Sequence, residues 1–449
     1  MFLLEKTDEL SVLTLGKIIS TFMTRDLPEL RRYHDYYKGK MKISYKMPTD
    51  EGRSCNKTVV NFCQTCVNVF NGYITGNDIT YSNEDETIDI KPILDVLNYN
   101  DVNQEDTEFL RNALIFGRAC ELNYVDSEGQ QRFSLLDPRN VIDVYDNTLE
   151  HNLIYGIYFY RADFSDEIVE DRYYVDVYSD HSIRHYISAP GFASFTLLDE
   201  EPHFFGQVPM TFFKLNAEED SIFDQIMGLN DAYNEMLSGN VDAFNDFSDA
   251  YLVLKGVTAN EDDLTAMKRH RVLMIDTDAD ASFLTKNVSD TQVQNTLTDI
   301  ERLIHVIGNF PDFYASDFSA QSGVALKYKL IGFTNISRNI EAYMRKALQK
   351  RIELICSILN IKGDEAAWRD INIEFNECLP EDMADTAQII NLLRGLVSDE
   401  TLIAQLEFVN NPKEEVERAR EEAKAKMPSL YGDAFEDSEL LAATPDAGE

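Results

Sequence analysis

The sequence predicts an α+β protein in which a β-rich block is followed by long helices. Apolar residues recur at steps of four and three over 293–307 and again over 326–347, which is the spacing of one helix face. From Ala119 onward apolar residues instead alternate with polar ones, as in half-buried strands. The chain has 449 residues, of which 44% are hydrophobic, so it can bury a sizeable core.

Helices are expected ahead of the strands. Residues 1–40 are charged and helical in pattern, and residues 41–57 read as a polar loop. Three further helices are expected: Thr58–Gly72, closed by its last residue, Asp89–Leu97 and Asn103–Phe116. Gly117 is the expected stop of the last of these, because glycine adopts the left-handed conformation that ends many helices.

The β-rich block is expected to begin with a hairpin. Its strands are Ala119–Tyr124 and Gln131–Leu136, joined by the turn sequence Asp126–Gly129. Four more strands are expected: Val141–Tyr145, Leu153–Tyr160, Arg172–Tyr178 and Ser182–Ile187. The block extends to about Leu215.

Two helices that flank a small insert follow the block. The first runs from Ile222 to about Ser248, and the second ends at Phe310-Pro311, because proline cannot supply the next backbone donor. The second carries the apolar stripe Val293, Leu297, Ile300, Ile304 and Ile307. The insert reads as two strands with a short helix between them: Ala250–Leu254, Glu261–Lys268 and Val272–Ile275. The two helices must lie side by side for the ends of the insert to meet, with Phe244 and Phe247 expected between them.

A very long helix is expected over Ser322–Leu359. At ~1.5 Å per residue it would span roughly 57 Å, whereas globular helices average about 11–12 residues. Its stripe comprises Leu326, Leu330, Phe333, Ile336, Ile340, Met344 and Ala347. Such a helix is expected to be a structural strut. The remaining elements are a strand at Asn372–Phe375, helices at Asp382–Leu393, Asp399–Leu406 and Lys413–Lys426, and an acidic disordered tail at Tyr431–Glu449.

The charge of the chain is extreme, at −38 with a pI near 4.4. Such a surface repels phosphate and argues against tight, sequence-reading nucleic-acid binding. It is compatible with a protein past which DNA slides, and solubility alone explains it equally well. No stretch reaches the 18 apolar residues of a membrane span, and Met1–Ser20 lacks the pattern of a signal peptide.

The familiar enzyme motifs are missing from the sequence. It contains no phosphate-binding P-loop, dinucleotide fingerprint, zinc-protease motif or nucleophile elbow. Cys63 and Cys66 form a single C-x-x-C that reads as part of a helix, so buried thiols are expected rather than a zinc site. His181 and His185 lie in a strand pattern, two pleats apart, so no metal or other cofactor is predicted. With 79 acidic residues, carboxylate pairs carry no information, and a metal-dependent hydrolase using carboxylates of the β-rich block is kept as the alternative function.

Short segments in a fixed order between about residues 30 and 420 carry a family resemblance. They are Tyr36–Gly39, Asn56–Asn61, Gly72–Gly76, Phe116–Glu121, Leu136–Val141, Asp231–Asn234, Asp249–Gly256 and Ser322–Leu330. Together they resemble the portal proteins of tailed bacteriophages. Each segment alone is weakly diagnostic, and their shared order and spacing make the match specific.

The resemblance implies a portal fold with named parts. These are a β-rich wing with N-terminal helices (1–220), a stem of two helices (221–249 and 289–309), a small α/β clip (250–288), a tunnel loop (310–321), a long wing helix (322–369), a helical crown (370–427) and an acidic tail (428–449).

The resemblance also implies a function without catalysis. Portal proteins form a ring of about twelve subunits at one capsid vertex of the virion, after assembly in the host cytoplasm. Double-stranded DNA passes through the ring without sequence-specific contacts during packaging and ejection. The implied protein partners are the terminase large subunit, then head-completion or adaptor proteins, and the major capsid and scaffolding proteins. No membrane partner is implied.

Two groups of site residues follow from the resemblance. The channel group comprises Asp312, Phe313, Tyr314, Ser316, Asp317, Phe318 and Gln321 of the tunnel loop, with Lys327 and Lys329 at the start of the long helix. For the aromatic residues the alternative is packing against the next subunit, and for the lysines it is salt bridging between subunits. The clip group is the basic run Lys268, Arg269, His270 and Arg271, which would dock an acidic partner or, alternatively, is a solvated helix end.

Overall fold

The computed structural model describes most of the chain in two units. The described residues are 2–5, 9–48, 54–83, 89–161, 172–248, 251–255, 280–284, 290–313, 323–359, 367–376 and 390–403, with 406, 409, 415–416 and 418–421 beyond them. The first unit is Met1–Phe375 and the second is Asn376–Glu449. The mixture of helices and strands confirms the α+β class. Among the described helices none combines the length and apolar character needed to cross a bilayer.

The chain begins with a short strand and two helices. Helix α1 (Val12–Arg25) starts at Ser11, whose side chain accepts a hydrogen bond from the Thr14 amide, and α2 (Leu27–Tyr37) follows directly. Strand β1 (Phe2–Leu4) pairs in parallel with β5 (Val141–Asp146). The expectation of helix from residue 1 is therefore wrong at this end, because three residues are too few to show a strand period.

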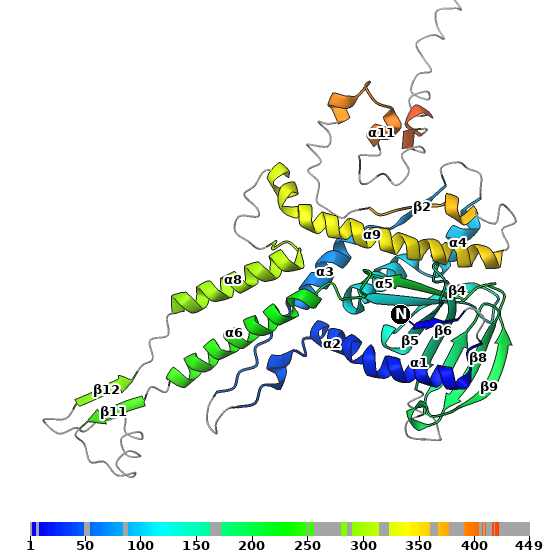
Figure 1. The fold of residues 1–449 in the computed structure, drawn as a ribbon. Coiled ribbons are helices and arrows are strands. Elements are labelled where there is room, and N and C mark those ends of the chain that lie inside the picture. The colour runs from blue at the N-terminus through cyan, green and yellow to red at the C-terminus, as the bar shows by residue number, and fades with distance from the viewer. Residues whose placement is uncertain are drawn as a thin grey trace, which may run out of the picture. The chain divides into compact units, whose positions relative to one another are not determined.

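A six-stranded sheet forms the larger β layer, in the order β1-β5-β6-β7-β8-β9 (Figure 1). Its remaining strands are β6 (Leu153–Tyr160), β7 (Tyr174–Tyr178), β8 (Ser182–Ser188) and β9 (Phe195–Pro202). Strands β5 to β9 pair antiparallel in chain order. The sequence did not predict β9, because nearly all of its residues are exposed and no apolar alternation marks it.

A second sheet has the order β10-β3-β4. Strands β3 (Arg118–Val125) and β4 (Gln131–Leu136) form the predicted hairpin, and β10 (Met210–Lys214) pairs with β3. Helix α5 (Val102–Phe116) enters β3 through Gly117, whose φ is +73°. A Cβ there would lie 1.9 Å from the carbonyl oxygen of Glu219, so only glycine fits this turn.

Two further helices and a small sheet complete this part of the first unit. Helix α3 (Phe62–Ile74) begins where Asn61 accepts a hydrogen bond from the Gln64 amide, and it continues through Gly72. The predicted helix is therefore confirmed, but it begins four residues later than predicted and Gly72 does not close it, since the helix ends two residues beyond. Helix α4 (Lys91–Tyr99) agrees with its prediction to within two residues. Strand β2 (Thr80–Ser82) pairs with β13 (Asn372–Glu374), which confirms the predicted strand near residue 372.

Helices α6 (Met227–Ser248) and α8 (Asp290–Gly308) lie side by side, as predicted from the insert between them (Figure 1). A 3-10 turn, η4 (Asp224–Ile226), leads into α6. The strand after α6, β11 (Tyr251–Lys255), pairs antiparallel with β12 (Asp280–Leu284). The predicted helix Glu261–Lys268 and strand Val272–Ile275 lie outside the described residues. Phe244 is 75% exposed, so the expectation that it packs between the helices is wrong.

Helix α9 (Gly323–Leu359) has 37 residues and confirms the long-helix prediction. It runs along β10 and also packs on α3 and α4 (Figure 1). Most of the predicted stripe is buried, namely Leu330, Phe333, Ile340, Met344 and Ala347. A separate 3-10 turn, η5 (Ala367–Asp370), precedes β13.

The second unit is described only in part. Helix α11 (Asp399–Ile403) occupies the start of one predicted helix, and residues 390–393 are helical at the end of another. Residues 415–416 and 418–421 are helical within the predicted Lys413–Lys426. The acidic tail at 428–449 lies outside the described residues.

Candidate functional site

An extended segment, 56–62, is fastened along α6 by a ladder of polar side chains. Four side chains of α6, spaced four residues apart, each accept a hydrogen bond from a backbone amide of the segment. The donating residues of the segment are spaced two apart. The pairs are Asn230 with Phe62 (3.1 Å), Asn234 with Val60 (2.8 Å), Ser238 with Thr58 (3.0 Å) and Asp242 with Asn56 (2.6 Å). Four helical residues advance ~6 Å and two extended residues ~6.6 Å, so the two periods stay in step.

The ladder fixes α6 to the rest of the first unit. Asn230, Asn234 and Ser238 are fully buried, and their side chains satisfy backbone groups that would otherwise lack partners. Asp231, on the neighbouring face, accepts a hydrogen bond from the Tyr36 hydroxyl at 2.6 Å and pairs with Lys42 at 3.0 Å. Sequence reasoning missed the ladder, although its signal is present as polar residues at steps of four.

The C-terminal end of α8 is shaped by a tight turn. Asn309 adopts the left-handed conformation (φ 52°), and Phe310, 2% exposed, folds back over the helix end. A Cβ at Gly308 would lie 2.7 Å from the Phe310 ring. Gly332 of α9 passes so close that a Cβ there would be 3.1 Å from the Asn309 side chain. The helix therefore ends within two residues of the predicted stop, and α9 crosses at that point.

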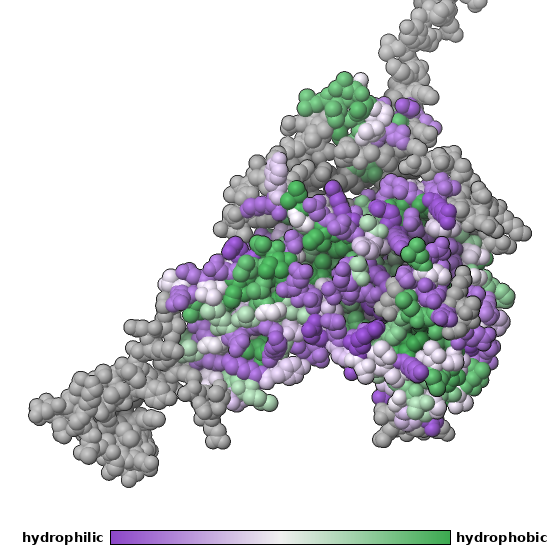
Figure 2. Space-filling view, viewed as in Figure 1, coloured by the Kyte–Doolittle hydropathy of each residue, from purple (hydrophilic) through white to green (hydrophobic). Residues whose placement is uncertain are grey.

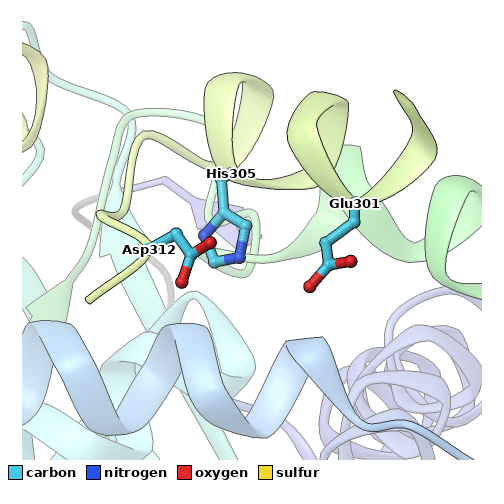
Figure 3. Close-up of side chains that lie close together, drawn as sticks. All are labelled: Glu301, His305 and Asp312. Carbon is cyan, nitrogen blue, oxygen red and sulfur yellow. The ribbon is translucent and has the colours of Figure 1, made fainter. Parts of the chain in front are cut away.

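Glu301, His305 and Asp312 come together beside this turn (Figure 3). Glu301 and His305 are one turn apart on α8, and Asp312 lies in the segment that follows the helix. One possible ligand atom from each side chain, an imidazole nitrogen or a carboxylate oxygen, lies within 4.8 Å of the other two. The family resemblance predicts Asp312 only as a residue of the tunnel loop, and nothing in the sequence pattern connects it with His305.

The structure places few of the predicted channel residues. Asp312 and Phe313 follow α8, and the side chain of Phe313 is 47% exposed. Lys329 is exposed in α9, and Lys327 belongs to the same helix. The rest of both predicted groups lie outside the described residues: Tyr314, Ser316, Asp317, Phe318, Gln321, Lys268, Arg269, His270 and Arg271. Of the predicted residues, the structure places Asp312 beside α8. The contacts of the channel group with DNA, and those of the clip group with docking proteins, stay predictions.

The paired helices and α9 expose large apolar side chains. On α8 these are Leu303 (36% exposed), Val306 (60%) and Ile307 (39%). Figure 2 shows the apolar area that lies over this helix. Further examples are Phe244 on α6 and Tyr328 and Ile331 on α9. Such grouped apolar surface marks an interaction site in soluble proteins.

Arg351, fully buried in α9, pairs with two carboxylates of the first unit. Its guanidinium lies 2.5 Å from Asp106 of α5 and 2.6 Å from Glu121 of β3. Burial raises the pKa of both carboxyls above their ordinary values, and Arg351 opposes that rise. The guanidinium also lies over the Phe133 ring, at 4.6 Å.

A second buried cluster contains Arg118, which belongs to the same Phe116–Glu121 segment as Glu121. Arg118 lies 3.3 Å from Asp143, and Lys214 lies 3.4 Å from the same carboxylate. Although burial alone would raise it, these two cations lower the pKa of Asp143 to about 2. The carboxylate is thus held as a structural anion, with no sign of an acid–base role.

The other sequence candidates for metal binding are occupied structurally. Cys63 and Cys66 are buried free thiols of α3, as predicted, and burial raises the pKa of each. His185 of β8 lies 2.7 Å from Asp176. Within the part of the chain that the structure describes, the group of possible metal ligands is the one on α8, away from the β-rich block that the hydrolase alternative requires.

Comparison with known proteins identifies the family. The family described as phage portal protein, SPP1 Gp6-like, matches residues 17–429. The portal protein of Bacillus phage SPP1 is 22% identical over 428 residues, covering 89% of this chain and 83% of that protein. The portal protein of Clostridium phage phiCD119 is 21% identical over 377 residues, covering 76% and 82%.

A solved structure is also similar. A chain from the neck of an empty GTA particle aligns with a TM-score of 0.48 and 11% identity, covering 85% of this chain and 93% of that one. The family match, which spans most of the sequence, does not favour the hydrolase alternative. The chain belongs to the SPP1 Gp6-like phage portal proteins, and is a structural, non-enzymatic component of a phage capsid.

Proposed function

We propose that the chain assembles into a closed ring of about twelve copies at one capsid vertex, and that DNA enters and leaves through the central channel. The observation that carries the proposal is the apolar surface on the outward face of the α6–α8 pair, where Val306 is 60% exposed. In a ring, each copy presents one face to the copy before it and a different face to the copy after it. Leu303, Val306 and Ile307 would be covered by such a neighbour.

The strut-like α9 supports the same arrangement. It packs on the β10 sheet along its buried stripe, while Tyr328 (73% exposed) and Ile331 (58%) point away from the chain's own core. These side chains are near the N-terminal end of the helix. A second copy would bury them together with the α8 surface.

The net charge of −38 suits a DNA conduit. Each phosphate contact from lysine or arginine adds affinity and would slow a moving duplex. An acidic channel wall limits such contacts. In this proposal residues 310–321, with Lys327 and Lys329, face the DNA as a tunnel loop.

The parts of the fold take the roles that the family resemblance implies. Helices α6 and α8 would form the stem, 250–288 the clip, residues 1–220 with α9 the wing, and 370–427 the crown. The basic run 268–271 would dock the terminase large subunit during packaging and then head-completion proteins. The major capsid and scaffolding proteins would surround the ring during assembly in the host cytoplasm.

Electron microscopy of the purified chain in negative stain tests the proposal. End-on views of the wild type are expected to show rings with a central hole. Val306→Glu places a charge in the interface and is expected to leave particles too small to show rings, with an unchanged circular dichroism spectrum. Leu149→Glu is the matched control, since Leu149 is 97% exposed in the turn between β5 and β6. Rings formed by Val306→Glu would refute this interface, and a wild type without rings would refute the assembly.

A further inference from the structure

We infer that Glu301, His305 and Asp312 bind one divalent transition-metal ion, such as Zn²⁺, which ties the segment after α8 to the helix. One imidazole nitrogen and two carboxylate oxygens are the ligand types that such ions take in proteins. The inference does not depend on ring assembly, because all three ligands belong to one chain.

The geometry of the three side chains is close to that of a bound site. Their ligand atoms lie within 4.8 Å of one another. Two ligands at ~2.1 Å from a tetrahedral ion are about 3.4 Å apart. Figure 3 shows Asp312 on one side of the imidazole and Glu301 on the other.

The orientation of His305 is an observation independent of the two acids. Its Nδ1 lies 3.2 Å from the carbonyl oxygen of Phe310. A carbonyl only accepts hydrogen bonds, so Nδ1 carries the proton and Nε2 keeps a free lone pair. Metal-binding histidines are commonly oriented by this kind of bond from the second ring nitrogen.

The surroundings of the imidazole also suit coordination. The centroid of the Phe310 ring lies 4.4 Å from that of the imidazole, and the Phe62 ring is nearly perpendicular to the imidazole at a centroid distance of 6.0 Å. Both phenylalanines are buried. An apolar wall on this side limits access of water, which strengthens ligand–metal interactions.

The position of the site gives the ion a structural role. Asp312 follows the left-handed Asn309 and Pro311, at the point where the chain leaves α8. A metal bond from Asp312 to two residues of the last two turns of α8 would hold that exit in one conformation. It would thereby hold Asp312 at a fixed position relative to α8.

Titration of the full-length, EDTA-treated chain with Co²⁺, a coloured substitute for Zn²⁺, tests the inference. We expect visible absorption bands that saturate at one Co²⁺ per chain and disappear when Zn²⁺ is added. Glu301→Gln and Asp312→Asn are each expected to weaken binding roughly tenfold or more, because each removes an anionic ligand. His305→Gln is expected to abolish the bands.

The controls separate a built site from general attraction to an acidic chain. His185→Gln removes a histidine that faces a carboxylate on another element, and it is expected to leave both the bands and the affinity unchanged. Circular dichroism verifies that each variant is folded. If His305→Gln does not fold, the Co²⁺ affinities of Glu301→Gln and Asp312→Asn decide the test. Equal Co²⁺ affinity in the wild type and the carboxylate variants, or no saturable absorption in the wild type, would overturn the inference.

Discussion

Replacing Arg351 with methionine is expected to destabilise the protein by about 3–5 kcal/mol at pH 7. Methionine is unbranched and apolar and fills the part of the space that the aliphatic stem of Arg351 occupies, so the loss is chiefly that of the charged guanidinium. The substitution leaves Asp106 and Glu121 buried without their cation, and removing one member of a buried ion pair typically costs this amount. The loss of the contact with the Phe133 ring adds to it.

The effect is expected to depend on pH. Burial already raises the pKa of Asp106 and of Glu121, and without Arg351 both are expected to rise further. A carboxyl whose folded-state pKa is above its unfolded value favours the folded state at low pH. The deficit of the variant should therefore shrink as the pH falls from 7 toward 5.

Urea unfolding at a fixed protein concentration, followed by far-UV circular dichroism, measures the effect. Arg302→Met is the matched control, because Arg302 pairs with Asp299 at the surface and its side chain is 66% exposed. This control should change the free energy of unfolding by less than about 0.5 kcal/mol. Adding Asp106→Asn and Glu121→Gln to Arg351→Met should recover most of the loss. A loss below about 1 kcal/mol for Arg351→Met, or one equal to that of the control, would refute the reasoning.

Three other substitutions test separate features of the first unit. Asn234→Leu leaves the Val60 amide unpaired and should lower the free energy of unfolding by about 1–3 kcal/mol, whereas Asn240→Leu on the exposed face of α6 should change it by under about 0.5 kcal/mol in the same urea assay. Gly117→Ala should lower the melting temperature sharply, because it combines a positive φ with a backbone clash worth roughly 2–5 kcal/mol; an unchanged melting temperature would show that this turn relaxes freely. Asp143, with its pKa lowered to about 2, should contribute about 2 kcal/mol at pH values above its ordinary pKa of 3.8 and lose it as the pH falls toward 2. Asp143→Asn should therefore flatten the fall in stability between pH 4 and 2, and an acid limb as steep as that of the wild type would contradict this assignment.

Strong periodic patterns made part of the fold predictable. The stripe from Leu330 to Ala347 predicts α9, because every third or fourth residue faces the same core. The β3–β4 hairpin is predicted by alternation on both sides of a turn sequence. Strands β1 and β9 are missed for opposite reasons, since one is too short for a period and the other has no buried face.

The partners within the side-chain clusters could not be predicted, because they are residues far apart in the sequence. Arg351 finds Glu121 across 230 positions, and Asn234 finds Val60 across 174. Nothing local to either residue indicates its partner. The approach of Asp312 to His305 depends on the left-handed turn at Asn309, which the sequence around it does not specify. The basic run and most of the tunnel loop lie outside the described residues and stay predictions.

Light scattering of the purified wild-type chain, at the exit of a sizing column, tests the central claim most directly. If neighbouring copies cover the apolar surface of the α6–α8 pair, the particle should have a mass of about 620 kDa, twelve times the 51.4 kDa of one chain. A species that stays at 51.4 kDa across a hundredfold range of concentration would contradict it.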